Sequence, residues 1–334
     1  MLGFVGSAGG GSFVADAPND DLNINASVER HVGDSDGYVV AEMEEGTYYY
    51  TYSGKEESFE VPEAGDYELI AVGGMGGSCN NNRGGYGAKA SGRFRLSEGD
   101  RLNIVVGGKG GDCNSKVGLH SGGGGAGATY VELEKVTSKT PELLLAAGGG
   151  GGAGKDYEGG DGEGGPNGWP GWGGKDGGGG GLSCQDDVNS SCSEGFFLIG
   201  GAGGGGYKGN GASRCGDPSC ICYTYYQPVG PIENDEREEC SRNNVLQAEG
   251  GESFQNGSKG GQEQFEKSFD VKEDGCWSSY VNGGFGGFGG GAQGGPLYLG
   301  VCESGRAEEN GGGGGAGGYS GGGGAEFQGM SGGG

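Results

Sequence analysis

Residues 143–154 have the sequence LLLAAGGGGGAG, in which a short apolar strand leads directly into a glycine tract. The same transition occurs at 70–77, IAVGGMGG, and at 104–111, IVVGGKGG. Glycine has no side chain to bury, so backbone contacts must hold an ordered tract. The extended threefold helix of polyproline II type, which polyglycine also adopts, allows such contacts. The pattern therefore predicts strands that continue into packed polyglycine II helices.

Composition alone is typical of a disordered chain. Glycine supplies 92 of the 334 residues, and the apolar share is 32%, against roughly 45–50% in globular proteins. However, the chain also contains 10 cysteines, 16 tyrosines, 12 phenylalanines and 3 tryptophans, which flexible linkers seldom carry. We therefore expect an ordered protein, with a linker or mucin-like protein as the alternative.

Strand patterns are concentrated in the first half of the chain. Apolar residues that alternate with period two predict strands within 38–50, 59–72, 92–106, 129–133 and 143–146. Pro62 and Gly65 supply a turn between two of these strands. Helical periodicity is absent apart from a weak polar pattern near 232–241. The fold class is thus expected to be all-β, an antiparallel sandwich.

Five segments follow from these patterns. They are an N-terminal strand segment and connector, the sandwich, glycine-rich rods, a cysteine-rich acidic insert with few apolar residues, and a second set of rods. Their expected bounds are 1–37, 38–147, 148–214, 215–282 and 283–334.

The cysteines predict disulfides and an extracellular location. Their number is even, no CxxC is present, and His31 and His120 are the two histidines, which disfavours zinc sites. Cys79 and Cys113 each follow a strand-to-glycine transition, so we predict a bridge between them. Cys276 and Cys302 flank a glycine rod, and Cys184 and Cys192 could close a short loop. Two further bridges of open connectivity are left for Cys215, Cys220, Cys222 and Cys240.

Other sequence features agree with secretion. N-glycosylation motifs begin at Asn25, Asn189 and Asn256. The first residues lack the pattern of a signal peptide, so we expect a mature or excised piece of a longer protein. No apolar run approaches the ~20 residues of a membrane helix.

The net charge of −25 arises from 46 acidic and 21 basic residues. This charge disfavours nucleic acids and anionic membranes as partners. It suits a basic protein ligand, divalent cations, or simple solubility that limits uncontrolled aggregation.

Five motifs occur in order within residues 59–154: FEVPEAGDYELIAVGGMGG, GGYGAKASGRF, LNIVVGGKGG, GGGGAGATYVEL and LLLAAGGGGGAG. In this order they resemble the TNF-like plus glycine-rich extracellular region of the anaplastic lymphoma kinase and leukocyte tyrosine kinase receptors. The resemblance implies a jelly-roll-like sandwich with an inserted polyglycine II bundle. Glycine-rich phage tail adhesins are a more distant likeness. The chain has no kinase domain, membrane helix or EGF-like module, so receptor signalling is not implied.

No catalytic constellation is visible, and we expect no enzyme and no cofactor. GxGxxG matches do not open a helix after a strand, as a nucleotide loop requires. Residues 34–37 and 161–163 resemble fragments of calcium loops without the remaining EF-hand ligands, which leaves calcium as an alternative.

Aromatic residues between the rods are expected to cap or wedge the glycine bundle, with a carbohydrate-stacking surface as the alternative. They are Trp169, Trp172, Phe285, Phe288 and Tyr319.

The two ends of the chain suggest a joint between copies. The last rod ends the sequence, whereas a strand that could follow it lies near the start, at Ser12, Phe13, Val14 and Ala15. We expect one of three origins: a piece cut from a tandem array, strand donation to the next copy, or an arbitrary chain boundary. Donation fails if residues 1–17 pack on their own subunit.

The function expected from these features is structural: a subunit of a self-assembling extracellular fibre, coat or adhesive appendage. Polyglycine II packing and disulfides would make it rigid. The alternative is a receptor-ectodomain-like module that binds a basic protein ligand. Expected partners are further copies, head to tail, and then a basic protein or a carbohydrate.

Overall fold

The structure is a computed structural model. It describes residues 13–14, 27–30, 36–43, 46–116, 118–162, 168, 173–180, 201–216, 245–262, 277–302, 305–309 and 311–324. In these ranges all pairing between strands is antiparallel, and the one helical element is a 3-10 turn, η1 (Phe254–Asn256). The predicted all-β class is confirmed.

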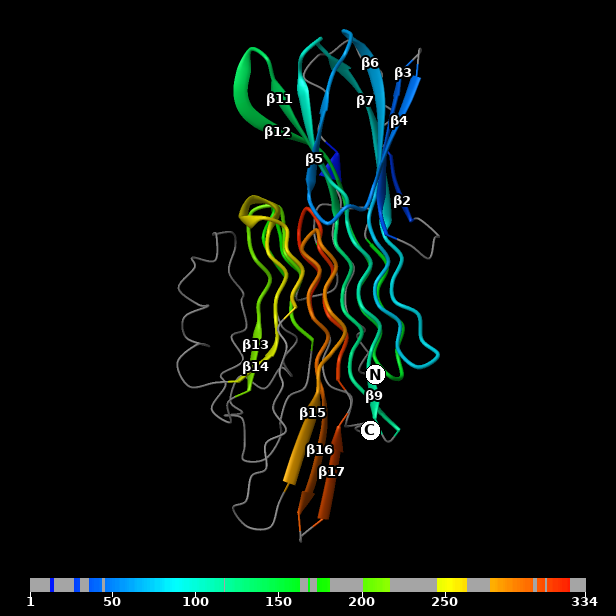
Figure 1. The fold of residues 1–334 in the computed structure, drawn as a ribbon, viewed down its shortest axis with the longest axis vertical. Coiled ribbons are helices and arrows are strands. Elements are labelled where there is room, and N and C mark those ends of the chain that lie inside the picture. The colour runs from blue at the N-terminus through cyan, green and yellow to red at the C-terminus, as the bar shows by residue number, and fades with distance from the viewer. Residues whose placement is uncertain are drawn as a thin grey trace.

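Two five-stranded sheets lie face to face at one end of the molecule (Figure 1). The first sheet has the order β1 (Phe13–Val14), β12 (Ser138–Ala147), β11 (Thr129–Lys135), β8 (Arg101–Val105), β5 (Glu56–Glu60). The second has the order β2 (Ser27–Arg30), β7 (Ala88–Leu96), β6 (Gly65–Val72), β3 (Tyr38–Met43), β4 (Gly46–Thr51). We refer to these sheets together as the sandwich.

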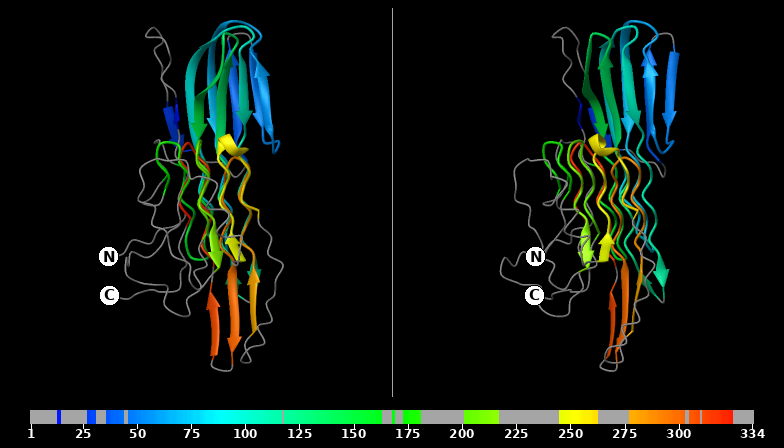
Figure 2. Two further views of the ribbon diagram at one scale, coloured as in Figure 1. Left: turned by 90° about the vertical axis from the view of Figure 1, so that its left-hand side faces the viewer. Right: turned by 60° about the vertical axis from the view of Figure 1, so that its left-hand side comes forward.

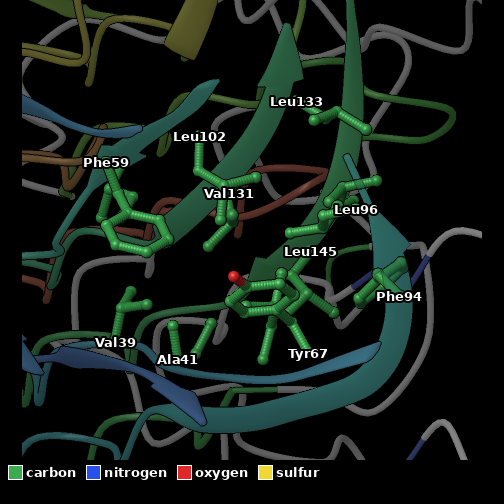
Figure 3. Packing of buried hydrophobic residues seen from close by; sticks show 14 of the residues in the cluster. Val39, Ala41, Phe59, Tyr67, Phe94, Leu96, Leu102, Val131, Leu133 and Leu145 are labelled. Atoms are coloured by element: carbon green, nitrogen blue, oxygen red, sulfur yellow. The ribbon is translucent and has the colours of Figure 1, made fainter. Parts of the chain in front are cut away.

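The core of the sandwich is built by the alternation that the sequence predicts. Tyr67 of β6 and Leu102 of β8 are fully buried and face each other from opposite sheets (Figure 3). Leu69 of β6 is fully buried in the same cluster. The Tyr67 hydroxyl donates a hydrogen bond to the Glu63 carbonyl at 2.8 Å, which satisfies its polar tip. Each such large apolar side chain contributes about 1.5–3 kcal/mol through burial.

Within the sandwich, β2 and β12 depart from the sequence prediction. β2 lies in a stretch whose polar composition indicates a connector, yet it pairs with β7. β12 begins five residues before the predicted strand and includes Pro141. The β11–β12 register shifts between Leu133 and Lys135, so Pro141 lies at an irregularity, where its missing N–H is tolerated.

Strands of the sandwich continue directly into glycine-rich segments at its lower end, as viewed in Figure 1. β6 and β7 remain paired up to Val72 and Lys89, and the glycine excursion between them starts there. We define the glycine bundle as the segments 73–77, 84–87, 107–111, 121–128, 148–154, 159–162, 173–180, 201–212, 249–262, 283–295 and 311–324. In both views of Figure 2 it extends away from the sandwich.

Three small sheets adjoin the bundle, in stretches where the sequence shows few strand signals. Two are hairpins, β9 (Ser115–Lys116) with β10 (Leu119–His120) and β13 (Arg214–Gly216) with β14 (Val245–Ala248). The third has the order β15 (Trp277–Val281), β16 (Leu297–Cys302), β17 (Gly305–Glu309) and lies farthest from the sandwich (Figure 1). These strands are short and pair at the ends of glycine segments, which periodicity does not reveal.

Candidate functional site

Segment 121–128 lies within a repeating pattern of backbone hydrogen bonds. Donors three residues apart reach the same neighbouring segment, as Gly122 and Gly125 do when they donate to Gly295 and Ala292 at 2.8 Å. The segments that accept from it are 289–295, 150–153 and 108–111. Three others donate to its carbonyls: 284–287, 314–317 and 74–77. Six stretches of backbone thus surround this segment, two of them from segment 283–295, and backbone hydrogen bonds hold them all.

The close spacing of the segments requires glycine. A Cβ added to Gly74 would lie 2.6 Å from the Gly108 carbonyl oxygen, and one added to Gly149 would lie 2.7 Å from two carbonyl oxygens. Real Cβ atoms do not approach backbone this closely, so a segment would have to move. Gly154 differs, because the nearest atom to an added Cβ is 4.0 Å away.

Alanines occupy the positions where a methyl group fits. Ala202, Ala248 and Ala292 come from three different segments, are fully buried and pack together. Ala248 and residues 249–262 belong to the stretch that the sequence assigns to a cysteine-rich insert. They join the bundle instead, as Gly251 shows by donating to the Gly203 carbonyl at 3.1 Å.

An aromatic cluster joins the sandwich-facing end of the bundle to the outer face of β11. We call it the aromatic cap; its members are Tyr130, Tyr207, Phe254, Phe288 and Tyr319. The rings of Tyr130 and Phe254 lie 4.9 Å apart, and those of Tyr207 and Phe254 stack at 5.3 Å. These contacts couple the two halves of the molecule through packed rings.

Two hydrogen bonds fix the cap. The Tyr130 hydroxyl donates to the Gly318 carbonyl at 2.7 Å, and the Tyr207 hydroxyl donates to Glu132 Oε1 at 2.6 Å. Glu132 is 8% exposed and so depends on this partner. Burial raises the pKa of Tyr130, and burial followed by the Glu132 carboxylate raises the pKa of Tyr207.

Phe288 and Tyr319 lie in the capping position that the sequence predicts. Phe285 is 40% exposed, and Trp169 and Trp172 are outside the described residues. The sequence did not single out Tyr207, Phe254 or Glu132. The sequence does hold one signal for the cap: Tyr130 is an aromatic residue on the strand face opposite to the core residues Val131 and Leu133.

The raised tyrosine pKa values predict alkaline destabilisation. In the unfolded chain Tyr130 and Tyr207 ionise near the ordinary pKa of 10.0, whereas the folded cap keeps them neutral. Their contribution to stability is therefore complete below pH 10 and is lost as the pH rises above it. We expect Tm, measured from pH 8 to 11, to fall above about pH 10, and to fall less steeply in Tyr130→Phe. Equal slopes would contradict this role of Tyr130.

The predicted bridge between Cys79 and Cys113 is confirmed, with their sulfur atoms 2.02 Å apart. It joins the ends of segments 73–77 and 107–111, beyond which Ser78 N donates to Asp112 Oδ1 at 2.8 Å. The bridge lies at the end of the bundle opposite the aromatic cap, so both ends of the bundle are fastened.

The other cysteines are less fully placed. Cys215 lies in β13 and Cys302 in β16. The residue after Cys276, Trp277, pairs with the residue before Cys302, Val301. A Cys276–Cys302 bridge stays a prediction. Outside the described residues are Cys184, Cys192, Cys220, Cys222, Cys240 and Cys276.

The remaining candidate residues are partly described. Asn256 is exposed, and its Nδ2 donates to Asn210 Oδ1 at 2.9 Å, whereas Asn25 and Asn189 are outside the described residues. Glycosylation stays a prediction.

The two calcium-like fragments contribute carboxylates that accept protein hydrogen bonds. Asp161 Oδ1 accepts from Arg83 at 2.8 Å and from the Tyr86 N–H at 2.9 Å. Asp36 Oδ1 accepts from the Lys109 N–H at 2.6 Å. A calcium ion would have to compete with these donors.

Strand donation between copies requires correction. Phe13 pairs with Ala146 and Val14 with Leu145 of the same chain, so β1 completes the sheet of its own sandwich. Pairing within the chain argues against strand exchange, because β1 already satisfies the edge of β12 without a second copy. Ser12 and Ala15 are outside the described residues.

Strand β4 forms an edge of the second sheet. Among the described strands it pairs with β3 alone, and it exposes Tyr48 by 37% and Tyr49 by 71%. Tyr52 follows at 42% exposure. Burial, and then the charge of Glu57, raise the pKa of Tyr50. We call residues 46–52 the tyrosine edge.

No protein-family model matches the chain, and no curated protein matches it either. In the described part of the chain, no helix has the length and apolar character that a membrane span requires.

Proposed function

We propose that the chain is an extracellular structural protein in which a polyglycine II bundle forms a rigid body below a jelly-roll-like sandwich. The observation that carries the proposal is the pattern around segment 121–128, in which donors three residues apart reach the same neighbour. Three residues per turn is the period of the polyglycine II helix. A lattice of this kind resists bending because every segment bonds to several others.

The resemblance to the TNF-like plus glycine-rich receptor region fits this proposal, since strands of the sandwich continue directly into glycine segments. The Cys79–Cys113 bridge and the ten cysteines overall support an oxidising, extracellular compartment. Rigidity then comes from backbone bonds in the middle of the bundle, aromatic packing at one end and the bridge at the other.

We further propose that copies assemble into a fibre, coat or appendage through the tyrosine edge. An edge strand offers unpaired backbone groups, and exposed tyrosines add contact area at low entropic cost. The net charge of −25 opposes contact between copies. Salt screens this repulsion, so assembly is expected to strengthen as ionic strength increases.

A second candidate function uses the same edge to capture a basic protein. Glu42 lies on β3, which pairs with β4, and Glu56 and Glu57 lie on β5, which follows β4 along the chain. A lysine-rich chain added to β4 would meet these opposite charges. Such binding is expected to weaken as ionic strength increases. The sign of the salt dependence therefore separates the two functions.

The test combines electron microscopy with light scattering over a dilution series at low and high NaCl, and a parallel titration with polylysine. We expect filaments or defined oligomers that increase with salt and decrease in Tyr49→Ala. Val136→Ala is the matched control, because Val136 is 61% exposed and follows β11 in the other sheet. A monomer at every concentration and salt, with salt-sensitive polylysine binding, would overturn the structural proposal in favour of the binding module.

A further inference from the structure

Three metal-ligating side chains meet at the disulfide end of the bundle. Cys79 follows segment 73–77, Cys113 follows segment 107–111, and His120 lies in β10. Their ligand atoms all lie within 4.8 Å of one another. Cys79 is 1% exposed, while Cys113 and His120 are half-buried. The cluster is thus reachable from solvent on one side.

Backbone contacts hold the three residues on a fixed frame. Cys113 N donates to the Ser78 carbonyl at 2.9 Å, which keeps the two cysteine segments in register. The His120 carbonyl accepts from Gly311 N at 2.9 Å. Leu119, next to His120, is buried against Leu297, so β10 is anchored to the bundle. A metal site needs ligands that are pre-positioned in this manner.

We propose that Cys79, Cys113 and His120 form a redox-controlled zinc site: a disulfide when oxidised and a three-ligand Zn²⁺ site when reduced. Two thiolates and an imidazole are a ligand set that zinc accepts, with the fourth position left for water. The sequence disfavours zinc because it has no CxxC. The fold brings together two cysteines that are 34 residues apart, a spacing that no local motif encodes.

The interconversion requires a dithiol reductant. Its thiolate attacks the sulfur of Cys113, the more exposed residue of the pair, the S–S bond breaks, and Cys79 leaves as a thiolate. The second thiol of the reductant resolves the mixed disulfide, so the protein gains two electrons and two protons and the reductant becomes a disulfide. Zn²⁺ then displaces the thiol protons on binding. Zinc would keep the two segments joined while the covalent bridge is open.

The test uses the full chain, reduced with a dithiol that is then removed without oxygen, and Co²⁺ as a spectroscopic probe that Zn²⁺ displaces. Other cysteines also become free, so the signal is the difference between the wild type and Cys79→Ser/Cys113→Ser. We expect a difference of one equivalent of tetrahedral, thiolate-bound Co²⁺, and no difference before reduction. Equal stoichiometry and equal spectra would overturn the proposal.

Single histidine variants keep the disulfide, so they test the site even if the double cysteine variant does not fold. His120→Ala keeps the disulfide, so its fold is checked in the oxidised state before reduction. After reduction its Co²⁺ affinity at this site is expected to fall more than about tenfold. His31→Ala, which changes the other histidine in the chain, is the matched control and should leave the affinity unchanged. Equal effects of the two variants, or no effect of His120→Ala, would exclude His120 as a ligand.

Discussion

Replacing Gly149 by valine is expected to lower the free energy of unfolding by about 4 kcal/mol, and replacing it by alanine by about 2 kcal/mol. The reason is that a Cβ at this position would lie 2.7 Å from the carbonyl oxygens of Ala126 and Gly127 in the central segment. The backbone of that segment is itself bonded to six neighbouring stretches of backbone, so it cannot move without breaking further hydrogen bonds. Thermal and denaturant unfolding measure the loss.

Gly154→Ala is the matched control for Gly149→Ala. Both glycines belong to segment 148–154, and the nearest atom to a Cβ at Gly154 is 4.0 Å away. The entropy that alanine removes from the unfolded chain is the same at both positions, so the difference between the variants reports the clash alone. We expect Gly154→Ala to change stability by no more than about 0.5 kcal/mol. Similar stabilities of the two alanine variants would contradict close packing around Gly149.

Tyr130→Ala is expected to lower the free energy of unfolding by about 4 kcal/mol, because it empties a fully buried site in the aromatic cap. The same change removes the ring contact with Phe254 and the hydrogen bond to Gly318. Since these contacts join the sandwich to the bundle, we also expect the single unfolding transition to separate into two. Calorimetry together with near-ultraviolet circular dichroism would detect the separation.

Tyr130→Phe separates the hydrogen bond of Tyr130 from its ring contacts, and Tyr49→Ala is a control at an exposed tyrosine. Tyr130→Phe keeps the ring and leaves the Gly318 carbonyl without its donor, so we expect a loss of about 1 kcal/mol. Tyr49→Ala removes a tyrosine that is 71% exposed and should change stability by less than about 0.5 kcal/mol. A Tyr130→Ala variant as stable as Tyr49→Ala would show that the cap does not couple the two halves.

Much of the sandwich could be predicted from the sequence. Its strands alternate apolar and polar residues, as Tyr67 and Leu69 of β6 illustrate, and burial of one face makes that pattern visible. The Cys79–Cys113 bridge could also be predicted, because each cysteine follows the same strand-to-glycine transition and the two strands run into the bundle together.

The arrangement of the bundle could not be predicted from the sequence in the same way. Glycine tracts carry no side-chain pattern that distinguishes one neighbour from another, so nothing in GGGGAGA indicates which segments accept its hydrogen bonds. The alanines are the partial exception, since Ala202, Ala248 and Ala292 mark positions where three segments meet. The sequence assigns residues 249–262 to the insert because many charged residues and five cysteines lie in the stretch 215–282 around them.

The cap and the metal-ligating cluster depend on contacts between distant residues. Tyr130 and Tyr207 are joined through Phe254, and His120 meets two cysteines from other segments. Their residue types are visible in the sequence, whereas their proximity follows from the path of the glycine segments.

Amide hydrogen exchange, followed by NMR on protein labelled with ¹⁵N-glycine, tests the central claim most directly. If the glycine segments form a lattice of backbone hydrogen bonds, the amides of the glycines at 122–125 and 127 should exchange as slowly as those of buried sandwich strands. Exchange of these glycines at the rate of an unstructured chain, while the sandwich amides remain protected, would contradict the account.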